Sequence, residues 1–385
     1  MTTDLAERGS FAPFDHPQLL PDGEREALRA QGHLVEIYAT KWPTRFAFAP
    51  DLGRALATEI SSFDIVHVHS VYVYTSVLAA RLARSRRIPY IVRPHGSFMP
   101  HLRRRSRLAK SVFHRFVGRP IWDAASAIHY TSERERDEAA DIRIEAPAMV
   151  IPLGVDISQF AELPARGSFR AAFPSVGTGP LIVYLGRLAP RKGIDLLIRA
   201  FAEIAPATPE SHLVVAGPDE FGYENVLKQE LERLGLRGRV SMPGLVTGQT
   251  KASLLADADI WVLPSLGENF GIAVVEALAA GCPVLISSKV DVLQELGDRR
   301  AVEVCEPEVA SIRTALDQLL RDGERRAEMS NRARRAAGLL SWEARIGPLV
   351  DLYSRLAPTS ARPVRDQANN AIHASRPQGV PPSSV

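Results

Sequence analysis

The sequence has 385 residues, which predicts two domains, or three, at roughly 100–200 residues per domain. Hydrophobic residues make up 45% and charged residues 24%, which excludes a mainly disordered chain and supplies apolar surface for two cores. Lys and Arg number 47 against 44 Asp and Glu, a net charge of +3, so we expect no nucleic-acid partner.

The chain carries no recognisable signal for export or membrane insertion. No apolar stretch approaches the ~18 residues that span a bilayer. The first residues lack the basic and apolar regions of a signal peptide. The cysteines, Cys282 and Cys305, are too few for a disulfide framework or a Cys-rich metal site. We therefore expect a cytoplasmic protein.

Short apolar runs alternate with amphipathic stretches along most of the chain, and each run is typical of a buried strand. The N-terminal runs are 33–38, 64–69, 88–92, 126–131 and 148–152. The C-terminal runs are 180–186, 212–217, 239–244, 259–265, 282–287 and 301–306. Helical patterns such as 196–205 and 226–235 lie between them. This alternation predicts an α/β protein with parallel sheets covered by helices on both faces.

The alternation lapses at 153–179, a stretch rich in Gly, Pro and Ser that is typical of an interdomain linker. One domain is therefore expected over 1–152 and a second over 180–340. Residues 341–357 predict a terminal helix, with Ser341 as its N-cap, that packs back toward the N-terminal domain. From 358 to 385 the composition predicts a disordered tail.

The densest chemical signal is PSLGENFGIAVVEALAAGCPVLIS at 264–287. A strand ends in a loop with Glu268, and a helix is predicted over 270–280. Three backbone amides should then be free at the helix N-terminus to bind an anion, those of Asn269, Phe270 and Gly271. The helix dipole alone would explain Glu268. It does not explain Glu276 among Ala, Val and Leu, since a lone buried carboxylate is costly.

A second signal is YLGRLAPRKGIDLLIRAF at 184–201, where Arg187 and Lys192 flank a tight turn and Gly193 opens a helix. Two cations beside a helix N-terminus can clamp a diphosphate and stabilise it as a leaving group. Two solvated loop cations would give the same pattern, so this motif is weak alone.

A third signal is YIVRPHGSFMP at 90–100, where His95 follows a strand and precedes Gly96. The carboxyl ends of parallel strands line the ligand crevice of open α/β sheets. A lone histidine is more often structural, and we interpret His67 that way. The neighbouring Pro94 and Gly96 favour a site role for His95.

Two further stretches bear on partners. Asp257 and Asp259 form an Asp-x-Asp that could ligate Mg²⁺. It precedes a strand instead of following one into a cleft, so we interpret it as a helix-end turn and expect neither a metal nor a cofactor. The stretch HLRRRSRLAKSVFHRFVGRP at 101–120 predicts a basic amphipathic helix. Such a helix fits an anionic membrane surface or an ordinary domain helix equally well.

Over roughly 24–356 these motifs, with TSE at 131–133 and PLGVD at 152–156, resemble the family-4 glycosyltransferases of the GT-B fold, most of all bacterial polysaccharide-assembly members. The resemblance implies two Rossmann-like domains with parallel sheets facing a central cleft. It implies a retaining transfer from a nucleotide-diphosphate sugar to a polysaccharide or lipid-linked acceptor, at the inner face of the membrane for a lipid-linked one. It also implies site roles: Arg187 and Lys192 on the donor diphosphate, Glu276 on the ribose, Glu268 facing the transferred sugar, and His95 near that sugar.

The start of the chain departs from the family pattern, because nothing before 25–40 matches the first strand and its Gly-rich turn. The N-terminal sheet is therefore expected to lack its first strand. A degenerate nucleotide-sugar-binding protein without efficient transfer and a GT-B sugar phosphorylase remain alternatives. A Rossmann dehydrogenase is disfavoured because no G-x-G-x-x-G follows a strand.

Overall fold

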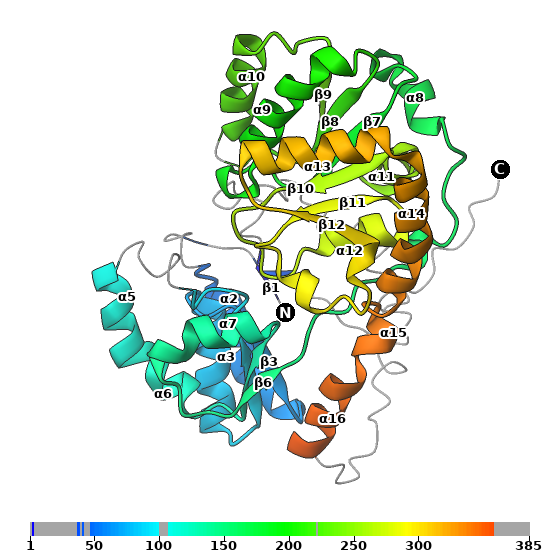
Figure 1. Ribbon diagram of the computed structural model, residues 1–385. Helices are drawn as coiled ribbons and strands as arrows, with labels where there is room; N and C mark the ends of the chain where they lie inside the picture. The colour runs from blue at the N-terminus through cyan, green and yellow to red at the C-terminus, as the bar shows by residue number, and fades with distance from the viewer. Residues whose placement is uncertain are drawn as a thin grey trace, which may run out of the picture.

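The computed structural model describes residues 2–3, 37–38, 41, 47–99, 107–220 and 222–357. These residues form two parallel sheets, one in each half of the chain, with helices packed against them (Figure 1). All the strands expected from the sequence are present, each shorter than its apolar run. The predicted class, α/β with two Rossmann-like sheets, is confirmed.

The N-terminal sheet has the strand order β3-β4-β5-β6, and its strands are all parallel. The strands are β3 (Val66–His69), β4 (Tyr90–Arg93), β5 (Ala127–Tyr130) and β6 (Ala148–Val150). The α-helices of this half are α2 (Pro50–Glu59), α3 (Tyr74–Ser85), α5 (Arg107–Phe113), α6 (Arg119–Trp122) and α7 (Glu133–Ala139), and a π-helix, His114–Gly118, joins α5 to α6. Tyr90 and Val92 of β4 belong to the main core on one face, and Ile91 belongs to a smaller core on the other.

The C-terminal sheet has the order β12-β11-β10-β7-β8-β9 and is parallel throughout. Its strands are β7 (Leu181–Leu185), β8 (His212–Ala216), β9 (Val240–Gly244), β10 (Ile260–Leu263), β11 (Val284–Ser287) and β12 (Val302–Cys305). Its helices are α9 (Ile194–Ile204), α10 (Tyr223–Arg233), α11 (Gly248–Asp257), α12 (Ile272–Ala279), α13 (Val309–Arg321) and α14 (Gly323–Gly338). Strands β7, β8, β10 and β11 are buried along their whole length, as expected for a sheet covered on both faces.

The segment between the sheets packs against the larger half. Its short helix α8 (Ser168–Ala172) is held by Asp257, which accepts hydrogen bonds from the amides of Gly167 and Arg170. Phe160 and Phe169 lie in the C-terminal core. The domain and linker boundaries given above remain predictions.

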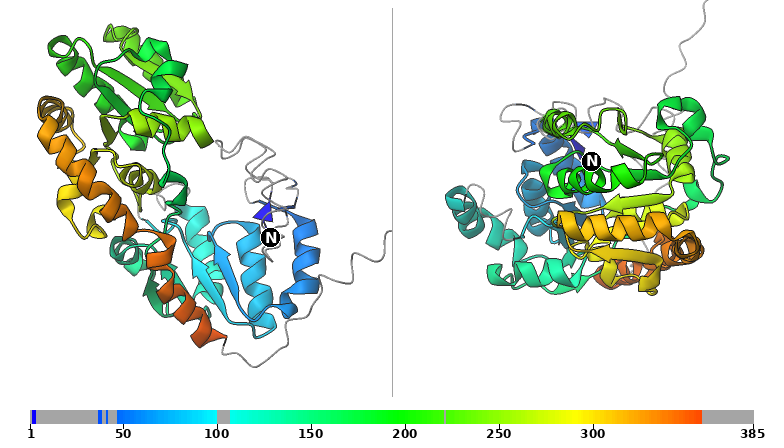
Figure 2. Two further views of the ribbon diagram at one scale, coloured as in Figure 1. Left: turned by 90° about the vertical axis from the view of Figure 1, so that its right-hand side faces the viewer. Right: turned by 45° about the horizontal axis from the view of Figure 1, so that its top comes forward.

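The chain returns to the smaller half through two helices, α15 (Trp342–Arg345) and α16 (Gly347–Leu356), where one was predicted. Ser341 is the N-cap, as predicted, and accepts a hydrogen bond from the Ala344 amide. Figures 1 and 2 show α14, α15 and α16 running in succession from the larger half to the smaller. There Leu352 packs with Ile91 of β4, so α16 covers one face of the N-terminal sheet.

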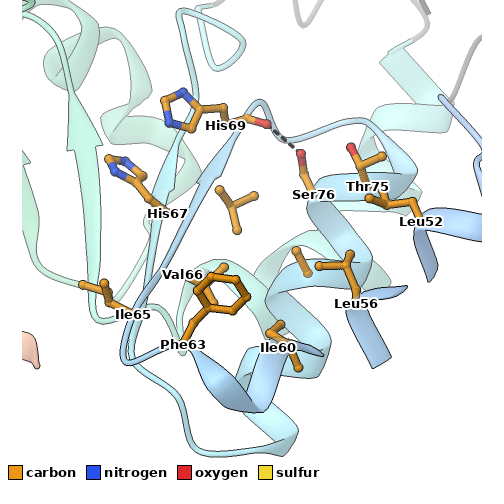
Figure 3. Close-up of a pocket in the computed structure, with 12 residues that line it drawn as sticks. Leu52, Leu56, Ile60, Phe63, Ile65, Val66, His67, His69, Thr75 and Ser76 are labelled. Atoms are coloured by element: carbon orange, nitrogen blue, oxygen red, sulfur yellow. Dashed lines mark hydrogen bonds between the residues drawn. The ribbon is translucent and has the colours of Figure 1, made fainter. Parts of the chain in front are cut away.

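The free side of β3 borders a groove of about 530 Å³ (Figure 3). Among the described strands β3 pairs only with β4, and a separate two-residue pair joins β1 (Thr2–Thr3) to β2 (Ile37–Tyr38). The expected absence of a first strand concerns residues that lie mostly outside the described ranges, as do the predicted tail and the Arg-rich residues 101–106.

Candidate functional site

Two loops that follow neighbouring strands of the C-terminal sheet meet in backbone contact. Gly193, the N-cap of α9, has a φ of 68°, and a Cβ there would lie 2.2 Å from the carbonyl oxygen of Pro264 after β10. Only glycine tolerates both constraints. The Arg191 carbonyl accepts hydrogen bonds from the Leu266 amide at 2.8 Å and the Ser265 hydroxyl at 3.0 Å. The predicted cations and acids are therefore held on one rigid unit.

Lys192 and Glu268 form an ion pair across these loops, and their side chains are only 17% and 20% exposed. The backbone of Glu268 is fixed on both sides, since its amide donates to the Lys289 carbonyl and its carbonyl accepts from the Asp291 amide, each at 3.0 Å. Residues assigned to different parts of a donor thus lie together at the carboxyl ends of β7 and β10.

Helix α12 begins at Ile272, two residues later than predicted, and ends at Ala279. The reason is Gly271, whose φ of 90° and ψ of 61° are not helical and place it at the N-cap. The three amides expected to bind an anion, those of Asn269, Phe270 and Gly271, make no hydrogen bond to the described residues. The Phe270 side chain is buried in the core at 3% exposure, so only its backbone can face a ligand.

Glu276, the carboxylate among apolar residues, has a partner that sequence reasoning missed. The Lys251 ammonium on α11 lies 2.9 Å from Glu276 Oε1, with side chains 18% and 16% exposed. This ion pair compensates the cost of the carboxylate. One oxygen of Glu276 engages Lys251, and the other is available for a ligand hydroxyl.

Arg187 differs from Lys192 in being more exposed to solvent. Its side chain is 47% exposed and pairs with Glu220, 2.8 Å away. An exposed pair of this kind contributes little to stability, so Arg187 can turn to a diphosphate at small cost.

His95 lies in the N-terminal half of the chain, in a tight turn after β4. Its φ is 51°, uncommon for a non-glycine residue. The turn is anchored by Glu135, a fully buried carboxylate that accepts hydrogen bonds from the Gly96 amide and from the Thr131 amide and hydroxyl. His95 Nε2 lies 2.8 Å from His69 Nδ1. Desolvation, followed by the charge of Arg93, lowers the pKa of His95 to about 3, so the ring is neutral at pH 7.

The two halves of the site touch through Asn269. Its side-chain amide donates to the Thr131 hydroxyl at 2.8 Å, and a Cβ built on Gly96 would lie 3.9 Å from Asn269 Cγ. A second contact joins Ser132 and Asp291 at 2.9 Å. The His95 turn and the Glu268 loop therefore lie close together, where the two halves of the chain meet. Thr131 is the first residue of the TSE segment and Glu135 lies two residues after it, so that segment was the sequence signal for both.

The described residues contain no group of three or more His, Cys, Asp or Glu arranged to hold a metal ion. The Asp-x-Asp pair lies at the end of α11, as predicted, where Asp257 caps α8 and Asp259 pairs with Arg166 and Arg170. Both aspartates are committed to structure, and metal independence stays a prediction.

Comparisons with known proteins agree with this geometry. The profile of the glycosyl transferases group 1 family matches residues 166–336, and that of the glycosyl transferase 4-like domain matches residues 11–154. A D-inositol 3-phosphate glycosyltransferase from Kineococcus radiotolerans is 30% identical over 253 residues, 61% of this chain and 58% of its own length. The chain thus spans less than two thirds of that relative. A phosphatidyl-myo-inositol mannosyltransferase from Mycolicibacterium smegmatis is 27% identical, over 86% of this chain and 88% of its own.

Among solved structures, Anabaena HepE in complex with UDP and glucose has a TM-score of 0.70 at 20% identity, covering 86% of this chain and 89% of its own. The chain belongs to the family-4 glycosyltransferases, and its architecture is the GT-B fold, as the sequence motifs implied.

Proposed function

We propose that the protein transfers a sugar, with retention of anomeric configuration, from a nucleotide-diphosphate sugar to a saccharide or lipid-linked acceptor. The observation that carries this proposal is the convergence of Lys192, Glu268 and the free amides before α12 on one edge of the cleft, opposite His95. This edge offers positive groups for a diphosphate and polar groups for a sugar.

Each group has a distinct part in the proposed reaction. Lys192, Arg187 and the helix amides stabilise the charge that grows on the diphosphate as the bond from the sugar C1 to the phosphate oxygen breaks. Glu276 accepts hydrogen bonds from the ribose hydroxyls. The acceptor oxygen bonds to C1 on the face that the phosphate leaves, and the leaving phosphate takes the acceptor proton. Neutral His95 binds a hydroxyl of the transferred sugar, and Glu268 faces that sugar from the other side.

The direct test is a panel of UDP-, GDP- and ADP-sugars, offered with simple saccharide and lipid-linked acceptors. Released nucleoside diphosphate measures turnover, and NMR of the anomeric proton gives the product configuration. We expect one donor to be consumed with retention. An inverted product would refute the retaining mechanism. A chain that binds a nucleotide sugar but releases nothing with any acceptor would support the degenerate-protein alternative.

We also propose that α5 and the π-helix after it contact an anionic membrane surface. None of the described helices has the length and apolar content of a bilayer-crossing segment. Phe113 and Val117 pack against the N-terminal core. Three other apolar side chains at helical spacing point outward, with exposures of 84% for Leu108, 59% for Val112 and 67% for Phe116. Figure 1 shows α5 projecting from the edge of the N-terminal half.

Basic groups flank this exposed stripe, which favours anionic lipid over a neutral apolar partner. The Arg115 guanidinium lies 5.9 Å from the centre of the Phe116 ring, and more Arg residues precede Leu108 in the sequence. Apolar insertion beside Lys and Arg is the pattern of interfacial helices. The relative named for phosphatidyl-myo-inositol acts, by that name, on a lipid. A lipid-linked acceptor would be met at such a surface.

Vesicle flotation tests this part of the proposal. The doubly changed Leu108→Ser, Phe116→Ser protein should lose binding to phosphatidylglycerol vesicles. A matched variant, Val226→Ser on the distant helix α10, removes a side chain 52% exposed and should bind normally. Binding that survives the double change, or that is equal for neutral vesicles, would contradict the proposal.

A further inference from the structure

Arg93, at the end of β4, is a buried cation with unpartnered guanidinium nitrogens among the described residues. It is 5% exposed, and its Nε and NH2 atoms are buried without a partner among the described residues. A guanidinium offers five N–H donors in a planar fork that matches an oxyanion. Burying such a charge unpaired is strongly unfavourable. The burial of this cation without full hydrogen bonding therefore needs an explanation beyond the packing of the fold.

The nearest buried acid does not supply that partner. Burial lowers the pKa of Arg93, and the charge of Glu135 opposes that shift through space, but the two oxygens of Glu135 accept hydrogen bonds from the Gly96 amide and from the Thr131 amide and hydroxyl. Glu135 thus holds the turn of His95 in place, and Nε and NH2 of Arg93 remain without a partner among the described residues.

The other groups around Arg93 are neutral rings on the same face of the sheet. His69 lies beside Arg93 in the β3–β4 register, and His67 and His129 lie on the same side. Figure 3 shows His67 and His69 projecting from one side of β3, away from Leu56 and Ile60. Burial is the first cause that lowers the pKa of His67 to about 3 and of His129 to about 4.

The direction of the hydrogen bonds divides the four histidines into two pairs. In the His67–His129 pair every ring nitrogen has a partner, and in the His69–His95 pair one ring N–H has none among the described residues. His129 Nε2 donates to the Ile151 carbonyl at 2.8 Å, so its Nδ1 accepts from His67 Nε2 at 3.4 Å. His67 Nδ1 then accepts from the Tyr353 hydroxyl at 2.6 Å, and both rings are satisfied. In the His69–His95 pair only one N–H is used between the rings. Whichever ring donates, one ring N–H of that pair remains for a ligand.

We propose that Arg93, with the His69–His95 pair, forms an oxyanion subsite in the N-terminal half of the cleft that binds a phosphate or carboxylate group of the acceptor. This inference rests on the proposed function, which places the acceptor on this side. The donor diphosphate is held by other residues on the opposite side, around Lys192. An acidic group docked at Arg93 would fix the acceptor beside His95 and the reacting sugar.

Calorimetric titration of the full chain with saturating UDP tests the subsite. The probes are glucose 6-phosphate, glucuronate and, as the uncharged control, glucose. We expect one of the charged sugars to bind and glucose not to bind. Arg93→Gln should weaken the charged probe about 10- to 100-fold, the loss expected for hydrogen bonds to a charged group. The tighter charged probe identifies the acceptor group as phosphate or carboxylate.

Lys192→Ala is the matched control, because it removes a cation from the opposite side of the cleft. It should weaken UDP and leave the charged sugar unaffected, whereas Arg93→Gln should do the reverse. If UDP fails to bind but the charged sugar depends on Arg93, the proposed function fails and the subsite stands. If UDP binds and the charged sugar is indifferent to Arg93→Gln, the subsite is refuted alone.

A measurement on the unchanged protein covers the case in which Arg93→Gln does not fold. Imidazole NMR signals of His69 and His95 should shift on addition of the charged sugar and not on addition of glucose. Signals that stay in place for both charged probes would overturn the proposal.

Discussion

Replacing Lys192 by alanine tests the donor site where the structure makes the strongest claim. The ammonium pairs with Glu268, and both side chains are less than a quarter exposed. A hydrogen bond to a charged group contributes about 1.5–3 kcal/mol, so Lys192→Ala should weaken UDP binding about 10- to 150-fold. Breaking a pair of intermediate burial should cost about 1–3 kcal/mol of stability, against a total of about 5–15 kcal/mol. The protein should remain folded.

The assay is calorimetric titration with UDP, together with thermal unfolding. Glu268→Gln is the informative companion, because it frees Lys192 from its partner. It should leave UDP affinity unchanged or higher while lowering turnover, so the two members of one ion pair should act in opposite directions on binding. Lys228→Ala, which breaks an exposed pair with Glu224, is the control and should change neither quantity. Equal UDP affinity in Lys192→Ala and the unchanged protein would refute the site assignment.

Three further outcomes are expected. Glu276→Ala should weaken nucleotide binding by about 1.5–3 kcal/mol, and unchanged affinity by calorimetry would contradict the ribose assignment. Lys251→Ala, which removes the ion-pair partner of Glu276, should lower the stability of the protein more than its affinity for the nucleotide. Excess chelator should not abolish turnover, and a loss restored by Mg²⁺ would contradict metal independence. The lowered pKa values of His67 and His129 mean that the unfolded chain binds more protons than the folded chain below the ordinary histidine pKa of about 6.5. Stability should therefore fall as the pH drops from 7 to 5.5, by roughly 1 kcal/mol for each ring. Urea unfolding of the double variant His67→Gln, His129→Gln should show a flatter pH dependence, and an identical slope would contradict this expectation.

The strands could be predicted because each is a short apolar run bounded by Gly, Pro or charged residues. The run at 180–186 became Leu181–Leu185, and the run at 282–287 became Val284–Ser287. The start of α12 was wrong by two residues because Gly271 adopts a left-handed conformation that the sequence letters do not reveal. The terminal helix divides near Gly347, since Pro348 is favoured in the first turn of a new helix and not inside an old one.

The partners of the site residues could not be predicted, because they come from elements distant in the chain. Lys251 and Glu276 lie 25 residues apart on different helices, and Asn269 reaches Thr131 across 138 residues. Arg93 and His69 become neighbours only through the pairing of β3 with β4. Such contacts depend on the order of the strands within the sheet. The sequence pattern shows which segments form strands, but it does not show which strands lie side by side. A structural His67 was expected, and its bond to Tyr353 agrees with that interpretation.

The distribution of charge explains why the two sides of the cleft should bind their ligands differently. On the C-terminal side each cation that we propose to bind the donor has a carboxylate partner, Glu268 for Lys192 and Glu220 for Arg187. A diphosphate must therefore compete with an acid already present, which favours exchange and release of the nucleotide product. On the N-terminal side Arg93 keeps its charge in a buried position surrounded by neutral rings. The nearby acid Glu135 is engaged by the Gly96 and Thr131 groups, so an anion at Arg93 would displace no ion pair of the described residues and would gain from the low local dielectric. Selection of the acceptor should therefore depend more steeply on this single cation than donor binding depends on either of its two.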